Sequence, residues 1–480
     1  METNQKTKSP MEKLQEKLTF SSKNAGGQLS DEQMKLVFDF NEGYKTFLNN
    51  SKTEGCCVET VIEMAEKQGY QPFIPGKSYA PGEKVYARNR GAAIILSTIG
   101  TKPIENGLRV IASHIDSPRL DLKPNPLYEE AEIAYLKTHY YGGVRKYQWP
   151  TIPLSIHGVV FKANGEMVKV NIGEDENDPQ FYITDLLPHL GREQGKKALS
   201  EAFPGEILNV IIGSLPYKGE NKEEEKEVEK IKEKTKFQIL KLLNEKYDIT
   251  EADFHTADLK IVPAFKARDI GLDRSLVGSY GHDDRVCAYA SLMAEFLMKE
   301  PAYTTVTILA DKEEVGSTGN TGLGSNYFQY FVEELAEVAD AKPRRVLAAT
   351  KALSADVNAA FDPNYSSVFE KRNSSYINHG VSVAKYVGSG GKGGTVDASA
   401  AYMSFIRTLL DNADVRWQVG ELGKIDEGGG GTVAKFLAQY DMDIVDIGVP
   451  VLSMHAPFEV VSKIDVYMAF RAFEEFYKNS

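Results

Sequence analysis

The stretch Ile308-Leu309-Ala310-Asp311-Lys312-Glu313-Glu314-Val315-Gly316-Ser317 reads as an apolar strand that ends in two adjacent carboxylates and a Gly-Ser turn. In open α/β sheets, ligands bind where strands end. Two neighbouring glutamates repel each other, so a fold that keeps both needs a cation close by. The stretch therefore predicts an α/β sheet with a cation site at one edge.

The rest of the chain supports such a sheet. Apolar, β-branched strands are expected at 92–98, 108–113, 304–310, 345–350, 381–386 and 447–453. Helices are expected at 285–299, 326–340, 399–411, 432–439 and 464–478, and the segment 31–69 reads as two helices split at Gly55-Cys56-Cys57. Strands that alternate with helices predict an α/β fold, here a mixed sheet with helices on both faces.

The region 122–260 interrupts this alternation. It begins with short β pieces and turns, and it ends in a run of alternating lysines and glutamates between Glu220 and Lys236. At 480 residues the chain is also too long for one ordinary core. We expect a smaller, mainly β domain at 122–260, inserted between the two parts of a larger domain at 1–121 and 261–480.

Composition narrows the class of protein. Apolar residues make up 42% and charged residues 26% of the chain, as in soluble globular proteins. No run is long enough to span a membrane, and the polar, lysine-rich start does not resemble a secretory signal. Three cysteines predict neither a disulfide framework nor a thiolate zinc site, which favours the cytoplasm. The net charge of −12 argues against nucleic acid as a partner.

Other candidate metal ligands also stand near expected strand ends or helix starts: His114, Asp283, Asp284, Asp356 and His455. Taken alone, each of these residues can also be explained without a metal. The histidines can be hydrogen-bonded core residues, and the aspartates can be helix caps or turn residues. One of Asp283 and Asp284 can cap the following helix while the other bridges two metals. Asp116 can orient His114, and Glu313 or Glu314 can stay free as a general base. Nitrogen and oxygen ligands without thiolate predict a catalytic site for zinc, cobalt or manganese.

These motifs carry a resemblance to a known family. The chain resembles the aspartyl aminopeptidase / aminopeptidase I family of dinuclear zinc exopeptidases over nearly its whole length. The motifs that match in order are His114-Ile115-Asp116-Ser117-Pro118-Arg119, Asp283-Asp284-Arg285, Asp311 to Ser317, Ser354-Ala355-Asp356 and Ser453-Met454-His455, with Tyr141-Gly142-Gly143 and Leu187-Pro188-His189-Leu190 in the inserted region.

The resemblance implies roles for individual residues. One metal would be held by His114, Asp283 and Asp356, and the other by Asp283, Glu314 and His455. Asp283 would bridge, Glu313 would be the general base, and Asp116 would orient His114. The inserted domain would mediate dimerisation within a closed homo-oligomer, usually a dodecamer. His189 would then reach a neighbouring subunit's site, and Lys385 would meet an acidic substrate side chain; a surface position is the alternative reading for each.

The expected function is therefore release of N-terminal residues from peptides by a water that two metal ions activate. Acidic N-terminal residues are one option and neutral residues the other, because the stretch Gly429 to Lys435 departs from the Gly-Ser-Thr-x-Gly-Pro segment of acid-preferring relatives. Two other functions stay open at this point. One is a related two-metal amidohydrolase or deacylase, and the other is an inactive peptidase-like scaffold.

Overall fold

A mixed nine-stranded sheet forms the centre of the larger domain in the computed structural model, which describes residues 8–20 and 22–479. The strands in spatial order are β1 (Gln71–Pro72), β2 (Lys84–Asn89), β3 (Ala93–Thr98), β13 (Thr305–Ala310), β4 (Arg109–His114), β14 (Lys351–Ala355), β18 (Asp443–Gly448), β16 (Val381–Ala384) and β17 (Trp417–Val419). The four central strands, β13, β4, β14 and β18, run parallel to one another. Their carboxyl ends consequently meet at one edge of the sheet.

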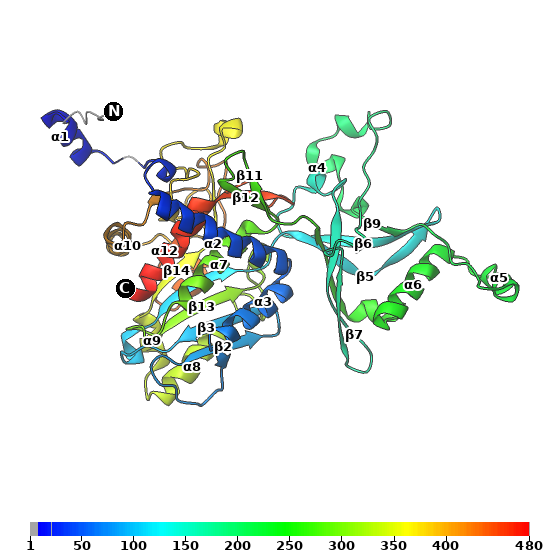
Figure 1. Ribbon diagram of the computed structural model, residues 1–480, viewed down its shortest axis with the longest axis horizontal. Coiled ribbons are helices and arrows are strands. Elements are labelled where there is room, and N and C mark those ends of the chain that lie inside the picture. Colours follow the sequence, from blue (N-terminus) through cyan, green and yellow to red (C-terminus); the bar gives the residue numbers. More distant parts are fainter. Residues whose placement is uncertain (1–7, 21, 480) are drawn as a thin grey trace.

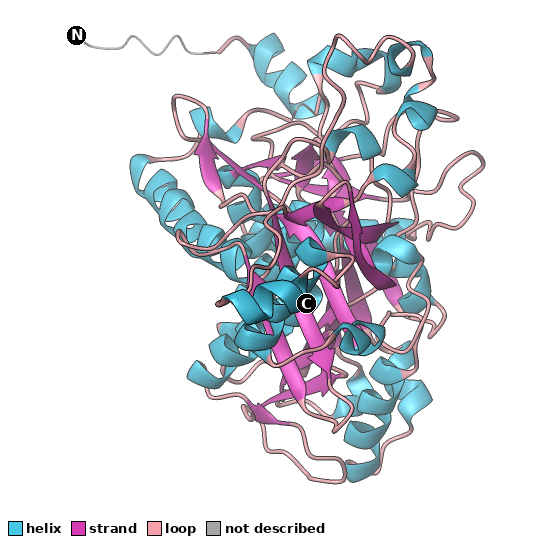
Figure 2. Cartoon of the chain, turned by 90° about the vertical axis from the view of Figure 1, so that its right-hand side faces the viewer, coloured by secondary structure: helices cyan, strands magenta, loops and turns pink. Residues whose placement is uncertain are grey.

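Helices cover both faces of this sheet (Figure 2). One face packs against α2 (Asp31–Asn50), α3 (Glu54–Lys67), α7 (His282–Phe296), α10 (Ala400–Asn412) and α12 (Lys463–Asn479). The other packs against α8 (Tyr327–Val338), α9 (Pro343–Ala348) and α11 (Ala434–Ala438). Neighbouring residues of β4 divide between the faces, with Ile111 in the first core and Val110 and Ala112 in the second. The expected fold class is confirmed.

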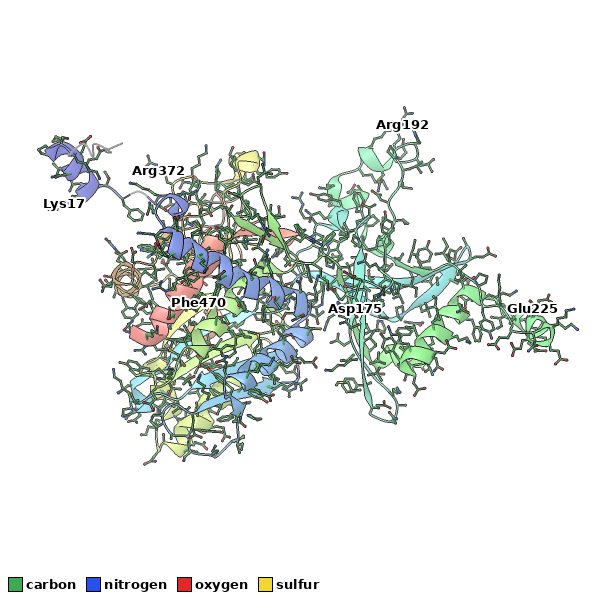
Figure 3. All side chains as sticks on the ribbon, viewed as in Figure 1. Lys17, Asp175, Arg192, Glu225, Arg372 and Phe470 are labelled. Carbon is green, nitrogen blue, oxygen red and sulfur yellow. The ribbon has the colours of Figure 1, made fainter. Side chains whose placement is uncertain are left out.

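A second sheet forms the inserted part and extends away from the nine-stranded sheet (Figure 1). Its strands in spatial order are β8 (Met167–Ile172), β7 (Leu154–Phe161), β10 (Ala257–Pro263), β5 (Arg119–Glu130), β6 (Ile133–Tyr141) and β9 (Val210–Gly213). It has its own core around the buried Trp149, and α4 (Leu199–Ala202), α5 (Lys222–Val228) and α6 (Lys234–Tyr247) belong to this part. Arg192 and Glu225 lie near its outer ends (Figure 3). The expected limits of 122 and 260 fall inside β5 and β10, and the three-segment division stays a prediction.

A third, five-stranded sheet links the end of the chain to the start of α7. Its strands in spatial order are β11 (Arg268–Ile270), β12 (Leu276–Ser279), β20 (Glu459–Ser462), β19 (Pro450–Leu452) and β15 (Asn358–Ala359). The chain leaves β12 toward Asp283 and leaves β19 toward His455. This small sheet thus fixes the backbone close to two of the expected metal ligands.

Two local predictions are wrong. The segment 345–350 is not a strand: residues Pro343–Ala348 form α9, where Pro343 occupies the first turn and suits a helix start, and the strand β14 begins at Lys351. Gly55-Cys56-Cys57 is not a turn either, because Thr53 caps α3 and these residues form its first turn. The helix break falls at 51–53 instead.

The N-terminal helix α1 (Pro10–Leu18) stands apart from the body of the molecule (Figure 1). Met11, Leu14 and Leu18 are exposed on it. None of the helices in the described residues is both long and apolar enough to cross a membrane.

Candidate metal centre

The parallel strands bring the predicted ligands together. In the register of β13 and β4, Ala310 lies opposite His114, so His114 and the glutamates after β13 share one edge of the sheet. Asp356 follows the last residue of β14 on the other side of β4. Asp283 and Asp284 lie at the start of α7 in non-helical conformations, and the peptide bond between them is cis.

The carboxylate of Asp283 lies between two histidines. Its Oδ1 is 3.0 Å from Nε2 of His114, and its Oδ2 is 3.1 Å from Nε2 of His455. Asp356 Oδ1 is 3.7 Å from the same nitrogen of His114, and Glu314 Oε2 is 3.5 Å from that of His455. Two sets of nitrogen and oxygen donors therefore share one carboxylate.

The hydrogen bonding of the buried carboxylates also indicates that this group of residues can hold metal ions. Asp283 Oδ1 and Glu314 Oε1 are buried without a hydrogen-bond donor, as are both carboxylate oxygens of Asp284. Buried carboxylates without donors are costly unless a cation compensates them. His114, Asp283 and Glu314 offer donor atoms within 4.8 Å of one another, and so do His114, Asp284 and Asp356. Asp284 is thus a further candidate ligand, for which the sequence left capping and bridging equally open.

Asp116 holds several parts of the site in place. Its backbone carbonyl lies 3.0 Å from Nδ1 of His114, and its Oδ1 lies 3.3 Å from the same nitrogen. The two carboxylate oxygens also accept the backbone N–H groups of Glu313 and Glu314, at 3.1 Å and 3.2 Å. A proton held on Nδ1 leaves Nε2 of His114 free to bind a metal.

The protonation of the site follows from burial and crowding. Burial raises the pKa of Glu313 to about 8, opposed by His114 and supported by Asp356. Burial also raises the pKa of Glu314, with the charge of Asp283 as the next cause. Burial alone would lower the pKa of His455, but the hydrogen bond and charge of Asp283, together with the charges of Glu314 and Glu459, raise that pKa to about 10. Burial and crowded negative charge thus account for these raised pKa values, and bound cations would oppose both effects.

A pocket of about 510 Å³ opens over this cluster. Asp283, Glu313, Glu314, Asp356 and His455 all line it. Its other walls are Gly143, Gly316, Ser317, Val357, Asn358, Val387, Leu422, Gly429, Gly430, Gly431, Thr432, Lys435, Phe436 and Met454. Lys435 is the one lysine or arginine among these lining residues. The volume of this pocket and the charges that line it suit the end of a peptide chain.

Comparison with known proteins identifies the family of the chain. The family model described as aminopeptidase I zinc metalloprotease (M18) matches residues 47–477. The chain belongs to the M18 aminopeptidase family. A probable M18 family aminopeptidase 1 of Clostridium acetobutylicum is 48% identical over 95% of this chain and 98% of the relative.

Solved structures of M18 aminopeptidases share the fold. The crystal structure of the Thermotoga maritima M18 aminopeptidase is 40% identical, with a TM-score of 0.89, over 96% of this chain and 100% of that one. The S. cerevisiae mApe1 dodecamer is 20% identical with a TM-score of 0.73, over 92% of this chain and 96% of that one, which shows the fold alone. The chain is therefore an aminopeptidase of a zinc metalloprotease family.

Two predicted residues of this M18 aminopeptidase, Lys385 and His189, lie neither in the cluster of candidate ligands nor in the lining of the pocket. Lys385 follows β16, is exposed, and donates a hydrogen bond of 2.7 Å to Asp397 Oδ1. His189 lies in an exposed turn of the inserted part. The roles expected for both remain predictions.

Other residues of the M18 site did not stand out in the sequence. Glu459 lies only four positions after His455 but belongs to none of the motifs singled out, and Lys435 was named only as the end of the stretch Gly429 to Lys435. Tyr141 is part of a motif that resembles the family, but the sequence assigned it no role. Their places depend on strand register and on the path of the glycine-rich loop.

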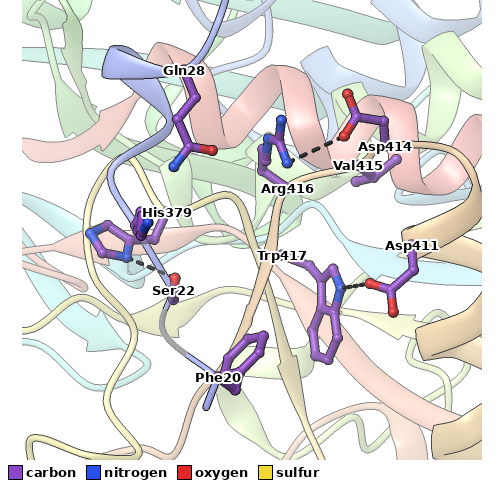
Figure 4. Close-up of a pocket in the computed structure, with 10 residues that line it drawn as sticks. Phe20, Ser22, Gln28, His379, Asp411, Asp414, Val415, Arg416 and Trp417 are labelled. Carbon is purple, nitrogen blue, oxygen red and sulfur yellow. Dashed lines mark hydrogen bonds and ion pairs between the residues drawn. The ribbon is translucent and has the colours of Figure 1, made fainter. Parts of the chain in front are cut away.

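A second pocket of about 510 Å³ lies between the N-terminal segment and the strand β17 (Figure 4). Ser22 Oγ and His379 Nδ1 lie in its lining at a hydrogen-bond distance of 2.8 Å, and Trp417 donates to Asp411 at 2.8 Å. None of the metal-ligand candidates lines this pocket. It is therefore separate from the M18 site.

Proposed function

We propose that this M18 enzyme releases N-terminal residues from peptides with two divalent metal ions. The observation that carries the proposal is the position of Asp283, whose two oxygens face His114 and His455. His114, Asp283 and Asp356 would hold one ion, and Asp283, Glu314 and His455 the other. Zinc fits these ligands, as would cobalt or manganese. Bound together, such ions lower the pKa of a water molecule and polarise a carbonyl.

Glu313 is the proposed general base. It lines the pocket, and among the described ion pairs none joins its carboxylate to His114 or His455, in contrast to the carboxylates of Asp283, Asp356 and Glu314. The backbone N–H of Glu313 is anchored on Asp116, so its side chain starts from a fixed point. Glu313 takes a proton from the attacking water and then delivers it to the amine that leaves. Asp116 orients the imidazole ring of His114 and does not itself take part in the proton transfer.

Selectivity for acidic N-terminal residues is part of the proposal, and two lysines are candidates for it. Lys385 is the candidate from the resemblance, although its ammonium group already binds Asp397. Lys435 lines the pocket itself, with its ammonium group 4.8 Å from the centre of the Phe436 ring. A lysine that lines the pocket can meet a substrate carboxylate without leaving an ion pair. We therefore propose Lys435 as the stronger determinant.

The assembly proposed for this chain is a cytoplasmic homo-oligomer, a dodecamer built from dimers. The S. cerevisiae relative is a dodecamer, and the inserted part offers a projecting surface with exposed Leu186, Leu187 and Leu190. Exposed apolar groups gathered on one loop are typical of contact surfaces. Multi-angle light scattering of the purified enzyme tests this, and a monomer would contradict it.

The activity test uses short peptides with free and with acetylated N-termini. The aminopeptidase releases the first residue of the free peptide, loses activity in a chelator, and recovers it with zinc. Cleavage of the acetylated peptide alone would favour a deacylase, and no turnover with any of zinc, cobalt or manganese would favour a scaffold. Selectivity is measured as kcat/KM for aspartyl, glutamyl, leucyl and alanyl substrates. Lys435→Met should lower the acidic values about tenfold or more and spare the neutral ones, with Lys385→Met as the matched comparison.

A further inference from the structure

Glu459 binds the backbone of two metal-ligand residues at once. Its Oε2 accepts the N–H of Asp283 at 3.1 Å, and its Oε1 accepts the N–H of His455 at 2.7 Å. The side chain is 1% exposed, so water does not compete for either bond. Asp283 and His455 are 172 positions apart in the chain, yet one carboxylate fixes both.

The third sheet explains how this contact arises. Glu459 opens β20 and pairs with Ser279 in β12, four residues before Asp283. On its other side, β20 pairs with β19, which ends three residues before His455. Both N–H groups therefore converge on Glu459 from the two neighbouring strands. His455 itself has a φ of 66°, in the left-handed region that a β-carbon disfavours, so its backbone needs such support.

A carboxylate is an unusual group for this position unless positive charge lies close by. It stands near Asp283, which is also acidic, and no lysine or arginine is among the main charged neighbours of Glu459 in the described residues. The two backbone N–H groups each bind a different oxygen of Glu459, and an amide in its place would offer only one acceptor oxygen. Metal ions held by Asp283 and His455 would supply the missing positive charge.

We propose that Glu459 is a positioning residue for the metal centre, one that holds Asp283 and His455 at the separation that a shared ion requires. The inference rests on the proposed two-metal function. Glu459 holds Asp283 and His455, and both of these residues would be ligands of the ion that Glu314 also binds. Of the two, only Asp283 would be a ligand of the other ion. The ion that Glu314 binds should therefore depend on Glu459 more than the ion beside Asp356 does.

The chain offers a matched control in Asp465. This buried carboxylate also accepts two backbone N–H groups, those of Asn378 at 2.8 Å and Gly380 at 2.7 Å. It lies six positions from Glu459, but the segment that it holds contains no metal-ligand candidate. Loss of general stability should thus affect both variants, whereas loss of metal should affect only one.

The experiment measures zinc affinity by competition with a chelating dye, together with the visible absorption of the cobalt-substituted enzyme. Glu459→Gln should weaken binding of the ion that Asp283, Glu314 and His455 would hold about tenfold to a hundredfold, the usual effect of losing an outer-shell partner. Its cobalt spectrum should change, and excess zinc should restore part of its activity. Asp465→Asn should bind both ions as the unmodified enzyme does.

Unchanged zinc affinity in Glu459→Gln, or an equal loss in Asp465→Asn, overturns the inference. If Glu459→Gln does not fold, Glu459→Asp takes its place, because it keeps the charge but falls one methylene short of the two N–H groups. Full affinity in that variant also overturns the inference. If the unmodified enzyme itself does not bind two ions, the proposed function fails first.

Discussion

The hydroxyl of Tyr141 donates a hydrogen bond of 2.7 Å to Oδ2 of Asp116. Tyr141 ends β6 of the inserted part, whereas Asp116 follows β4 of the nine-stranded sheet. The bond therefore joins the inserted part to the residue that orients His114. Arg119 fixes the tyrosine ring from above, with its guanidinium 3.7 Å from the ring centre.

Removal of this hydroxyl should loosen the metal centre without unfolding the chain. Tyr141→Phe leaves Asp116 with one donor fewer, and we expect metal affinity to fall about tenfold, as for other outer-shell partners. Tyr140→Phe is the control, because its neighbouring ring is exposed and no metal-ligand candidate contacts it in the described hydrogen bonds. Zinc titration of both variants makes the comparison. Equal affinities would show that Asp116 does not need Tyr141.

The adjacent glutamates should respond differently to the same substitution. Glu313→Gln should keep its metal ions and lose about a hundredfold to ten-thousandfold in kcat, since general-base catalysis contributes that much. Glu314→Gln should lose metal as well as activity, because Oε2 of Glu314 faces His455. Metal analysis of the two purified variants separates these outcomes. A missing ion in Glu313→Gln would reassign Glu313 as a ligand.

Part of this site could be predicted because apolar strands, and the residues that follow them, can be recognised from short stretches of the sequence. His114, Glu313 and Glu314 follow apolar strands whose carboxyl ends must meet in a parallel sheet. Tyr141 and Glu459 could not be assigned roles, since their contacts depend on the register of strands far apart in sequence. The segment 345–350 misled because its apolar residues suit a helix or a strand equally, and only packing decides.

The metal-free enzyme should lose stability as the pH rises. Glu313 has a pKa of about 8 in the folded chain and His455 about 10, against roughly 4.3 and 6.5 in unfolded chains. Both pKa values are raised by folding, so the folded state holds more protons, and the stability that these groups contribute is lost as the pH rises through the folded values. The lowered pKa of Asp283 acts only in acid, below this window.

Thermal unfolding between pH 5 and pH 9 measures this effect. The chelated enzyme should show a falling Tm across the range, whereas the zinc-loaded enzyme should change less, because metal ions replace the bound protons. The same Tm profile with and without zinc would mean that these groups do not bind metal.

The last prediction concerns His189 and the assembly. If His189 reaches a neighbouring subunit's pocket, it would donate a hydrogen bond to the oxygen of the scissile carbonyl as charge develops there. His189→Ala should then lower kcat about a hundredfold or more, the usual loss for one such donor, with metal content and particle mass unchanged. His139→Ala is the control, because this histidine is also exposed on the inserted part.

A mixing experiment tests whether His189 acts across subunits. His455→Ala lacks a metal ligand, and His189→Ala lacks the donor, so the activity of each homo-oligomer should be strongly reduced. A mixed particle can join an intact His189 from one subunit to an intact metal centre in another, and activity should therefore return in part. Near-normal kcat in His189→Ala would end the idea. Absence of recovery in particles shown to be mixed would confine His189 to its own subunit, because the two lesions could not then complement each other.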